Sequence, residues 1–182
     1  RDYRRIAHCY EALNICPLGG GSMGSTTWDI DRNYTAKLLG FDAPVDNSID
    51  CVASRDFTTD ILAVLSLSAN TLSRFCQDLY VWATPDYGYV EVSDSCAVCS
   101  SIMPQKKNPW VLEHIKAKAA HVEGAFMSAL NVLKNVIYSH SEDTCGEAAK
   151  YLFTGIDEMK EMCELMEVSI KGITVKKDRM LE

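Results

Sequence analysis

Apolar residues recur at helical spacing along almost the whole chain, and no segment alternates with strand period for more than a few residues. The pattern predicts a first helix over residues 2–14, ended by Pro17. A second helix is expected to begin at the N-cap Asp29 and to end at Gly40. Between them, residues 19–24 fit the spacing G-x-G-x-x-G. Because a helix and not a strand precedes these glycines, a tight turn is favoured over a dinucleotide site.

Three longer amphipathic stripes follow, and each predicts a long helix. The first two helices are expected over about 50–83 and 109–135, antiparallel, with Pro109 at the first helical position and a polar loop at 84–108 between them. The stripes consist of Phe57, Ile61, Leu65, Leu72, Phe75, Leu79 and Trp82, then Leu112, Ile115, Ala119, Val122, Phe126, Leu130 and Leu133, and last Ile156, Met159, Cys163, Met166 and Ile170. We therefore expect an all-α fold, with a central helical bundle portion over 1–135 and a small C-terminal helical domain over 136–182.

Composition narrows the class of protein. The chain has 182 residues and a formal net charge of −7, which argues against nucleic acid as its main partner. Its apolar runs fall short of the roughly 18 residues that a membrane span needs. It begins at Arg1 without an initiator methionine or an apolar signal segment, so we expect it to be a portion of a longer, cytoplasmic protein.

Eight cysteines are distributed through the helical patterns, which favours reduced thiols in a cytosolic protein over a disulfide framework. Cys96 and Cys99 have the Cys-x-x-Cys spacing of a zinc or redox site. A zinc ion would need two further ligands, and the four histidines form no suitable pair. A zinc or redox role stays a minor alternative, and we expect neither a metal nor a cofactor.

The polar loop carries the most chemistry. Residues 99–109 read Cys-Ser-Ser-Ile-Met-Pro-Gln-Lys-Lys-Asn-Pro and lead directly into a helix. Two hydroxyls, two lysines and an amide lie within ten residues. These groups can supply a base, a cation for developing negative charge and a grip on a carboxylate, which is the inventory for removing a proton beside a carboxylate.

This string resembles the flexible signature loop of the fumarase, aspartase and argininosuccinate lyase superfamily, and its Gln-Lys-Lys-Asn-Pro ending is most similar to the argininosuccinate lyase branch. Two further segments resemble that branch in the same order. Residues 1–19 are similar to its helix and Pro-Leu-Gly turn, and residues 47–57 to its Asn-Ser-x-Asp-Ala-x-Ser-x-Arg-Asp-Phe segment. Together the three motifs cover most of residues 1–135.

The resemblance implies an elimination that releases fumarate from an N-substituted aspartate through an aci-carboxylate intermediate. It places the catalytic base at Ser100, the stabilising cation at Lys106 and a carboxylate-binding amide at Asn108. Glu113 matches the family's carboxylate that pairs with a histidine. Further substrate contacts are expected from the matched residues Ser101, Met103 and Arg55. Without the resemblance, Ser100 would be a turn residue and Glu113 a solvated glutamate favoured by the helix dipole.

Three departures from the family pattern stand out. Cys99 replaces the glycine before the serine pair, and Trp110 replaces an aspartate after Asn-Pro. The family's Tyr-Asn…Gln-Glu-Asp-Lys segment, which holds the distal amino acid of argininosuccinate, has no match in residues 140–149. The resemblance therefore implies an intact fumarate half and an altered leaving-group half. The acidic residues of that segment, which suit either an amine-rich leaving group or a solvated turn, are Glu142, Asp143 and Glu147.

The resemblance also implies that a complete active site needs residues that this chain does not contain. The family's active-site histidine and its Ser-Arg-Asn segment lie upstream of the position that Arg1 occupies, and each site is assembled from three subunits of a homotetramer. We therefore expect this chain by itself to be inactive. Two alternatives stay open: a catalytically silent scaffold, as in the related lens crystallins, and a fumarate-releasing lyase with a different leaving group.

Overall fold

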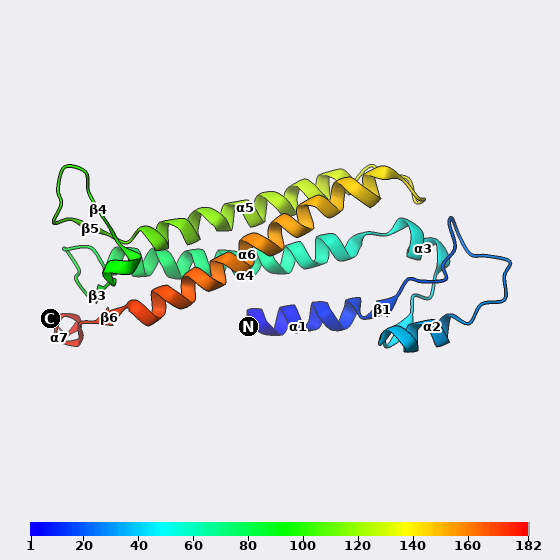
Figure 1. Ribbon diagram of the computed structural model, residues 1–182, viewed down its shortest axis with the longest axis horizontal. Helices are drawn as coiled ribbons and strands as arrows, with labels where there is room; N and C mark the ends of the chain where they lie inside the picture. Colours follow the sequence, from blue (N-terminus) through cyan, green and yellow to red (C-terminus); the bar gives the residue numbers. More distant parts are fainter. Residues whose placement is uncertain (182) are drawn as a thin grey trace. The chain divides into compact units, whose positions relative to one another are not determined.

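The computed structural model describes residues 1–181, and these are mostly helical (Figure 1). The helices are α1 (Asp2–Leu13), α2 (Arg32–Leu39), α3 (Ser48–Ala53), α4 (Asp56–Trp82), α5 (Trp110–Leu133), α6 (Ala148–Gly172) and α7 (Lys177–Met180). A 3-10 turn at Asp94–Cys96 and a π-helical turn at Asp143–Glu147 complete the helical segments. The expected all-α class is confirmed, and α5 lies close to its predicted bounds of 109–135.

Six strands of two residues each form three separate pairs. The strands are β1 (Ile15–Cys16), β2 (Ala43–Pro44), β3 (Val90–Glu91), β4 (Val98–Cys99), β5 (Lys107–Asn108) and β6 (Thr174–Val175). β1 and β2 are parallel, whereas β3 pairs with β6 and β4 with β5 in antiparallel register. In residues 1–181 none of these pairs gains a third strand, so each pair connects only two short segments.

The chain divides into two compact units. The first comprises Arg1–Leu65 with Gly124–Gly155, and the second comprises Ser66–Glu123 with the segment from Ile156 onward. The helices α4, α5 and α6 each contribute one part to each unit. The separate C-terminal domain expected over 136–182 stays a prediction.

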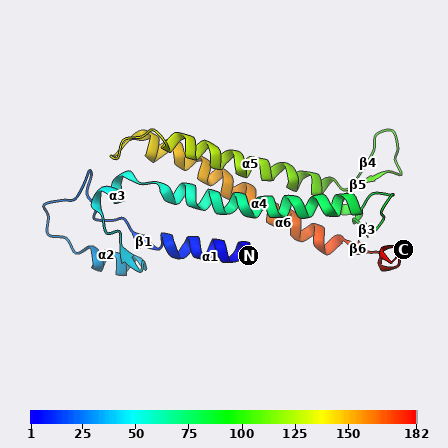
Figure 2. The same cartoon turned by 180° about the vertical axis from the view of Figure 1, so that it is seen from behind.

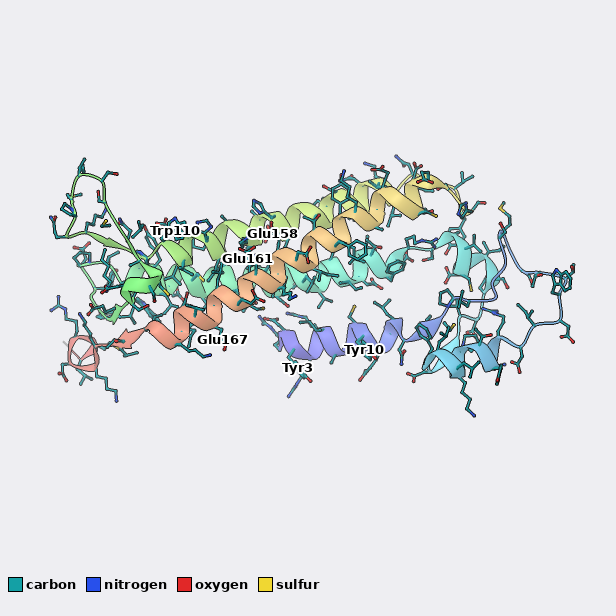
Figure 3. The ribbon with its side chains drawn as sticks, viewed as in Figure 1. Tyr3, Tyr10, Trp110, Glu158, Glu161 and Glu167 are labelled. Atoms are coloured by element: carbon teal, nitrogen blue, oxygen red, sulfur yellow. The ribbon has the colours of Figure 1, made fainter. Side chains whose placement is uncertain are left out.

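In the first unit the three long helices meet around Leu62 of α4, which is fully buried. Ala125 and Ala129 of α5 and Leu152 of α6 complete this core. Helix α1 lies along the same part of α4 (Figure 2), where it helps to line a groove of about 500 Å³ with Ile61 and its neighbours. No residue of α1 is itself buried, and its Tyr3 and Tyr10 project outward (Figure 3).

The second unit confirms the predicted stripe on α5, because Leu112, Ile115, Ala119 and Val122 are all buried. The prediction for α6 was correct only for Met159 and Met166. Ile156, Cys163 and Ile170 are exposed, and Met162 is fully buried instead. The buried side chains of α6 in this unit are Met159, Met162, Met166 and Ser169.

One ionic cluster joins α5 to α6 in the second unit. The Lys118 ammonium lies 2.9 Å from a carboxylate oxygen of Glu158 and 2.6 Å from one of Glu161. His121 Nδ1 lies 3.1 Å from the other Glu158 oxygen. Both glutamates belong to α6 (Figure 3).

One predicted helix start was wrong. The N-cap of α2 is Asp31 and not Asp29, because the Asp31 carboxylate accepts the Tyr34 amide at 2.9 Å and satisfies a free donor of the first turn. Helix α1 ends at Leu13 with Asn14 as its C-cap, in agreement with the predicted helix over residues 2–14. The predicted end of α2 is confirmed, since Gly40 adopts a left-handed conformation with φ of +80°.

The single helix expected over about 50–83 is divided into α3 and α4. Asn47 caps α3 by accepting the amides of Ile49 and Asp50. At the other end Ser54 has an extended backbone, and the Arg55 guanidinium donates to the Val52 and Ser54 carbonyls. A side chain that satisfies free carbonyls stabilises the helix end at this point, which apolar periodicity does not record.

Two helical glycines of the first unit make a matched pair for testing core packing. A Cβ at Gly155 would lie 2.3 Å from Leu62 Cδ2, whereas a Cβ at Gly124 would meet nothing within 4 Å. We expect Gly155→Ala to destabilise the protein by about 1–3 kcal/mol, since overpacking forces a buried side chain to move. Gly124→Ala should instead stabilise it by up to about 1 kcal/mol through helix propensity. Urea unfolding of both variants measures this, and equal shifts of the same sign would contradict the packing described.

Candidate active site

The polar loop singled out in the sequence is a hairpin with a short stem. Val98 pairs with Asn108 and Cys99 with Lys107, so residues 100–106 form its tip. The Asn108 side chain strengthens this stem by donating from Nδ2 to the Val98 carbonyl at 3.2 Å. The hairpin projects beyond the start of α5 (Figure 1). The predicted irregular loop at 84–108 therefore contains paired strands.

The two serines of the tip differ in exposure. Ser100 is half-buried, and its hydroxyl oxygen accepts the Ile102 amide at 3.4 Å. Ser101 is exposed. The contact at Ser100 is the local turn that the residue type favours. It uses a lone pair of the oxygen and leaves the hydroxyl proton able to make another bond.

The two adjacent lysines have different surroundings. Lys107 Nζ lies 2.7 Å from Asp94 Oδ1 and 3.5 Å from Glu91 Oε1. The hydrogen bond to Asp94 is the largest influence that raises the pKa of Lys107 above its ordinary value. Lys106 is exposed, and its ammonium forms no ion pair with any of residues 1–181. Lys106 is therefore the lysine of this pair whose charge is available to a ligand.

A cavity of about 970 Å³ lies beside the hairpin within the second unit. Its lining includes three residues proposed from the sequence, namely Met103, Lys106 and Asn108. The other residues that line it with polar or charged side chains are Tyr80, Thr84, Glu91, Gln105, Lys107, Lys176 and Arg179. Four cationic side chains against one carboxylate make this lining predominantly positive, which favours an anionic ligand.

Glu113, in the first turn of α5, meets a tyrosine of the same cavity. The Tyr80 hydroxyl donates to the Glu113 carboxylate, and this hydrogen bond is the main reason why the pKa of Tyr80 is raised. No histidine within the described chain forms an ion pair with Glu113. Glu113 is thus an exposed glutamate that is hydrogen-bonded to Tyr80 and is not paired with a histidine of the described chain.

Trp110 begins α5 and packs edge-on against His114, with ring centroids 4.2 Å apart (Figure 3). Its side chain remains half-exposed. An aromatic ring thus stands directly after the Asn108-Pro109 pair, where the family pattern has an aspartate.

Arg55 and the acidic segment belong to the first unit. Besides capping α3, the Arg55 guanidinium lies 3.6 Å from Cys145 Sγ. Cys145 in turn contacts His140 Nε2 at 3.5 Å. The acidic residues of the segment are all exposed, as a solvated turn predicts; they are Glu142, Asp143 and Glu147.

The cysteine motif divides between the interior and the surface. Cys96 is buried, Cys99 is exposed, and all eight cysteines are free thiols. Among residues 1–181 no three His, Cys, Asp or Glu side chains are grouped so that they could hold a metal ion. Burial raises the pKa of the Cys76 thiol to about 11, as expected for a cysteine that serves as a core residue.

Several residues of the cavity were not predicted from the sequence. Tyr80 lies beside the apolar stripe one turn before the loop, and its polar hydroxyl is the signal that could have identified it. Glu91, Lys176 and Arg179 carried no comparable signal, because their proximity depends on the pairing of β3 with the distant β6.

A family model described as "Lyase" matches residues 1–124, which include the hairpin and the start of α5. The chain belongs to the fumarase, aspartase and argininosuccinate lyase superfamily. The expected family is therefore confirmed, and the superfamily consists of lyases that release fumarate.

Relatives of known name point to one branch. The chain is 51% identical over 180 residues to argininosuccinate lyase 1 of Shouchella clausii, covering 99% of this chain and 36% of that protein. It is 38% identical over 181 residues to the argininosuccinate lyase of Acetivibrio thermocellus, covering 100% and 39% respectively. The chain thus spans well under half the length of these relatives.

A solved structure is also similar. An EDDS lyase variant with bound fumarate superposes with a TM-score of 0.80 at 30% identity, over 98% of this chain and 35% of that one. Within the described part of the chain, no helix is both long and apolar enough to cross a membrane.

Proposed function

We propose that the complete protein is a carbon–nitrogen lyase that eliminates an amine from an N-substituted aspartate and releases fumarate. The observation that carries the proposal is the cavity beside the hairpin. It brings together Lys106, Asn108 and Met103 in a positively charged lining, and Lys106 has no ion-pair partner among the described residues. A succinyl group has two carboxylates, so a cationic cavity of this kind suits it.

The reaction requires removal of one proton from carbon, cleavage of the carbon–nitrogen bond and protonation of the leaving amine. A base takes a proton from the carbon beside a carboxylate, and the electron pair forms first an aci-carboxylate and then the carbon–carbon double bond. The carbon–nitrogen bond breaks, and the amine leaves with its electron pair and takes up a proton. The aci-carboxylate carries two negative charges, and fixed positive charge nearby is what lowers its free energy most.

We assign the base to Ser100 and the stabilising cation to Lys106. Asn108 retains a second N–H after bonding to Val98, and that proton is free to reach a substrate carboxylate. Ser101 and Met103 lie on the same hairpin, and we assign them to the substrate-binding tip. Glu113 acts through Tyr80, whose ring lines the cavity.

Arg55 is a further proposed substrate contact, although in this chain its guanidinium also caps α3. Residues upstream of Arg1 are required as well, since the matched motifs supply no histidine beside Glu113. We infer a homotetramer with shared sites, for which exposed large apolar side chains such as Trp28 and Leu38 are supporting observations. Eight free thiols support a cytoplasmic location.

A catalytically silent scaffold is the competing interpretation. Such a scaffold has no need of a lysine without a charge partner or of a cationic cavity. The retained combination of Ser100, Lys106 and Asn108 therefore favours the enzyme.

We further propose that the leaving amine differs from that of argininosuccinate. Trp110 presents an aromatic ring where the family has an aspartate, and residues 140–149 lack the family's tyrosine, glutamine and lysine. A site that has lost hydrogen-bonding groups loses its discrimination in favour of a polar substrate.

The complete protein, incubated with a panel of N-succinyl amines that includes argininosuccinate, is expected to release fumarate fastest from another member of the panel. Ultraviolet absorbance of fumarate follows the reaction, and boiled protein is the control. Argininosuccinate as the best substrate would overturn the altered leaving group but not the lyase. No fumarate from any member would favour the silent scaffold.

A further inference from the structure

The hairpin is held by a chain of four charged side chains that the catalytic assignment does not use. From Asp94 the chain runs to Lys107 at 2.7 Å, from Lys107 to Glu91 at 3.5 Å, and from Glu91 to Lys176 at 2.8 Å. These residues come from the 3-10 turn, β5, β3 and the residue after β6. One ionic chain thus ties together segments that are far apart in sequence.

Glu91 is the link in this chain that joins two elements. Its Oε1 faces Lys107 of the hairpin and its Oε2 faces Lys176, whereas Asp94 forms an ion pair with Lys107 alone. The backbone fixes both ends of the second contact. Glu91 pairs with Thr174 in the β3–β6 ladder, and the Lys176 amide donates to the Tyr89 carbonyl at 2.9 Å.

We propose that Glu91 is a positioning residue for the lyase reaction: by holding Lys107 against the anchored Lys176, it directs Lys106 and Asn108 into the cavity. Lys107 and Asn108 form β5 and Lys106 directly precedes it, so fixing Lys107 also restrains the backbone from which Lys106 and Asn108 extend. Lys106 and Asn108 flank Lys107 directly, and all three line the same cavity together with Glu91 and Lys176. This inference rests on the proposed function.

The charge environment agrees with this geometry. The pKa of Glu91 lies below its ordinary value, first because of the hydrogen bond with Lys176 and then because of the positive charges of Lys176 and Lys107. The pKa of Asp94 is lowered by its hydrogen bond with Lys107. All members of the chain are partly or largely exposed, and ion pairs of this kind add little to the free energy of unfolding. This ionic chain therefore matters for the geometry of the site and not for stability, because small displacements of a catalytic group lower the reaction rate strongly.

The test is Glu91→Gln in the complete protein, which keeps the shape of the side chain and removes its charge. We expect kcat for fumarate release to fall by about 10-fold, with a smaller change in KM and an unchanged melting temperature. Glu91→Asp should recover part of the loss. The matched control is Glu167→Gln, since Glu167 forms a similar exposed ion pair with Lys171 on α6 (Figure 3).

Salt gives a second readout that a purely structural role would not produce. Added NaCl screens exposed ion pairs, so kcat of the unmodified protein should fall with salt toward that of Glu91→Gln. The ratio of kcat of the unmodified protein to kcat of Glu91→Gln should therefore decrease as salt is added. A ratio that stays constant would overturn the positioning role, as would a kcat of Glu91→Gln equal to that of Glu167→Gln.

Hydrogen exchange separates failure of this inference from failure of the proposed function. Amides of residues 98–108 should exchange faster in Glu91→Gln than in Glu167→Gln, whether or not the protein releases fumarate. Faster exchange in Glu91→Gln, together with no fumarate release by the unmodified protein, would retain the positioning role of Glu91 and reject the lyase function. Unchanged exchange in a protein that releases fumarate would reject the positioning role alone.

Discussion

Ser100→Ala in the complete protein is expected to lower kcat for fumarate release by about 10²–10⁴-fold, the usual contribution of a positioned base. Substrate affinity should change little, because the hydroxyl acts on the transferred proton and makes only a local turn contact with the Ile102 amide. Single-turnover fumarate release measures the first quantity, and fumarate binding by calorimetry measures the second.

Ser95→Ala is the matched control for this variant. Ser95 lies on the same loop and, like Ser100, is not among the residues that line the cavity; its hydroxyl contacts Ser93 and Cys96. It should keep the activity of the unmodified protein. Full turnover in Ser100→Ala would move the base to another residue and leave Ser100 as a turn former.

Lys106→Ala is expected to impair both binding and turnover, since its charge meets the carboxylate in the ground state and the aci-carboxylate that follows. We expect kcat to fall by about 10²–10³-fold, as when one stabilising donor of an oxyanion is removed. Fumarate affinity should weaken by roughly 10-fold or more, the loss of a hydrogen bond between charged groups. Steady-state kinetics and calorimetry give the two numbers.

The control for Lys106 is Lys160→Ala, which removes an exposed lysine of α6 outside the cavity lining. Arginine at position 106 should restore affinity better than turnover, because it keeps the charge but places it differently. If Lys106→Ala bound fumarate normally, the cation would have to be sought among the other basic residues of the cavity.

Most of the fold could be predicted from the sequence, because long apolar stripes carry strong periodic signals. The second stripe shows this, since four of its members are buried in α5. The strand pairs could not be predicted in the same way. Each has only two residues, and each depends on a partner elsewhere in the chain, as Val90 depends on Val175.

The residues of the candidate site also differ in whether the sequence could predict them. Lys106, Met103 and Asn108 lie within one contiguous motif, and the structure places them around one cavity. Glu91 and Lys176 meet only after β3 and β6 pair, so no local pattern could connect them. The sequence also gave no reason to distinguish Lys107, with its two carboxylate partners, from Lys106.

The first stripe shows where periodicity failed. The fully buried residues of α4 include Leu62 and the small Thr58, Ala69 and Cys76, whereas the large Phe57 and Phe75 remain about 40% exposed. Large apolar side chains dominate a search for periodicity, but several interior positions of α4 hold small ones. The register of the interior face was therefore misjudged.

The interior positions of α4 mix small residues with Leu62 and Leu79, whereas Phe57 and Phe75 are exposed, and this difference affects how each position tolerates change. At Ala69 a larger side chain would have no room, so folding of this chain limits substitutions there by volume. At Phe75 the folding of this chain sets a much weaker limit, because the side chain is about 40% exposed. Restriction of natural variation at Phe57 and Phe75 would consequently measure selection for contacts made outside this chain, separately from selection for its folding.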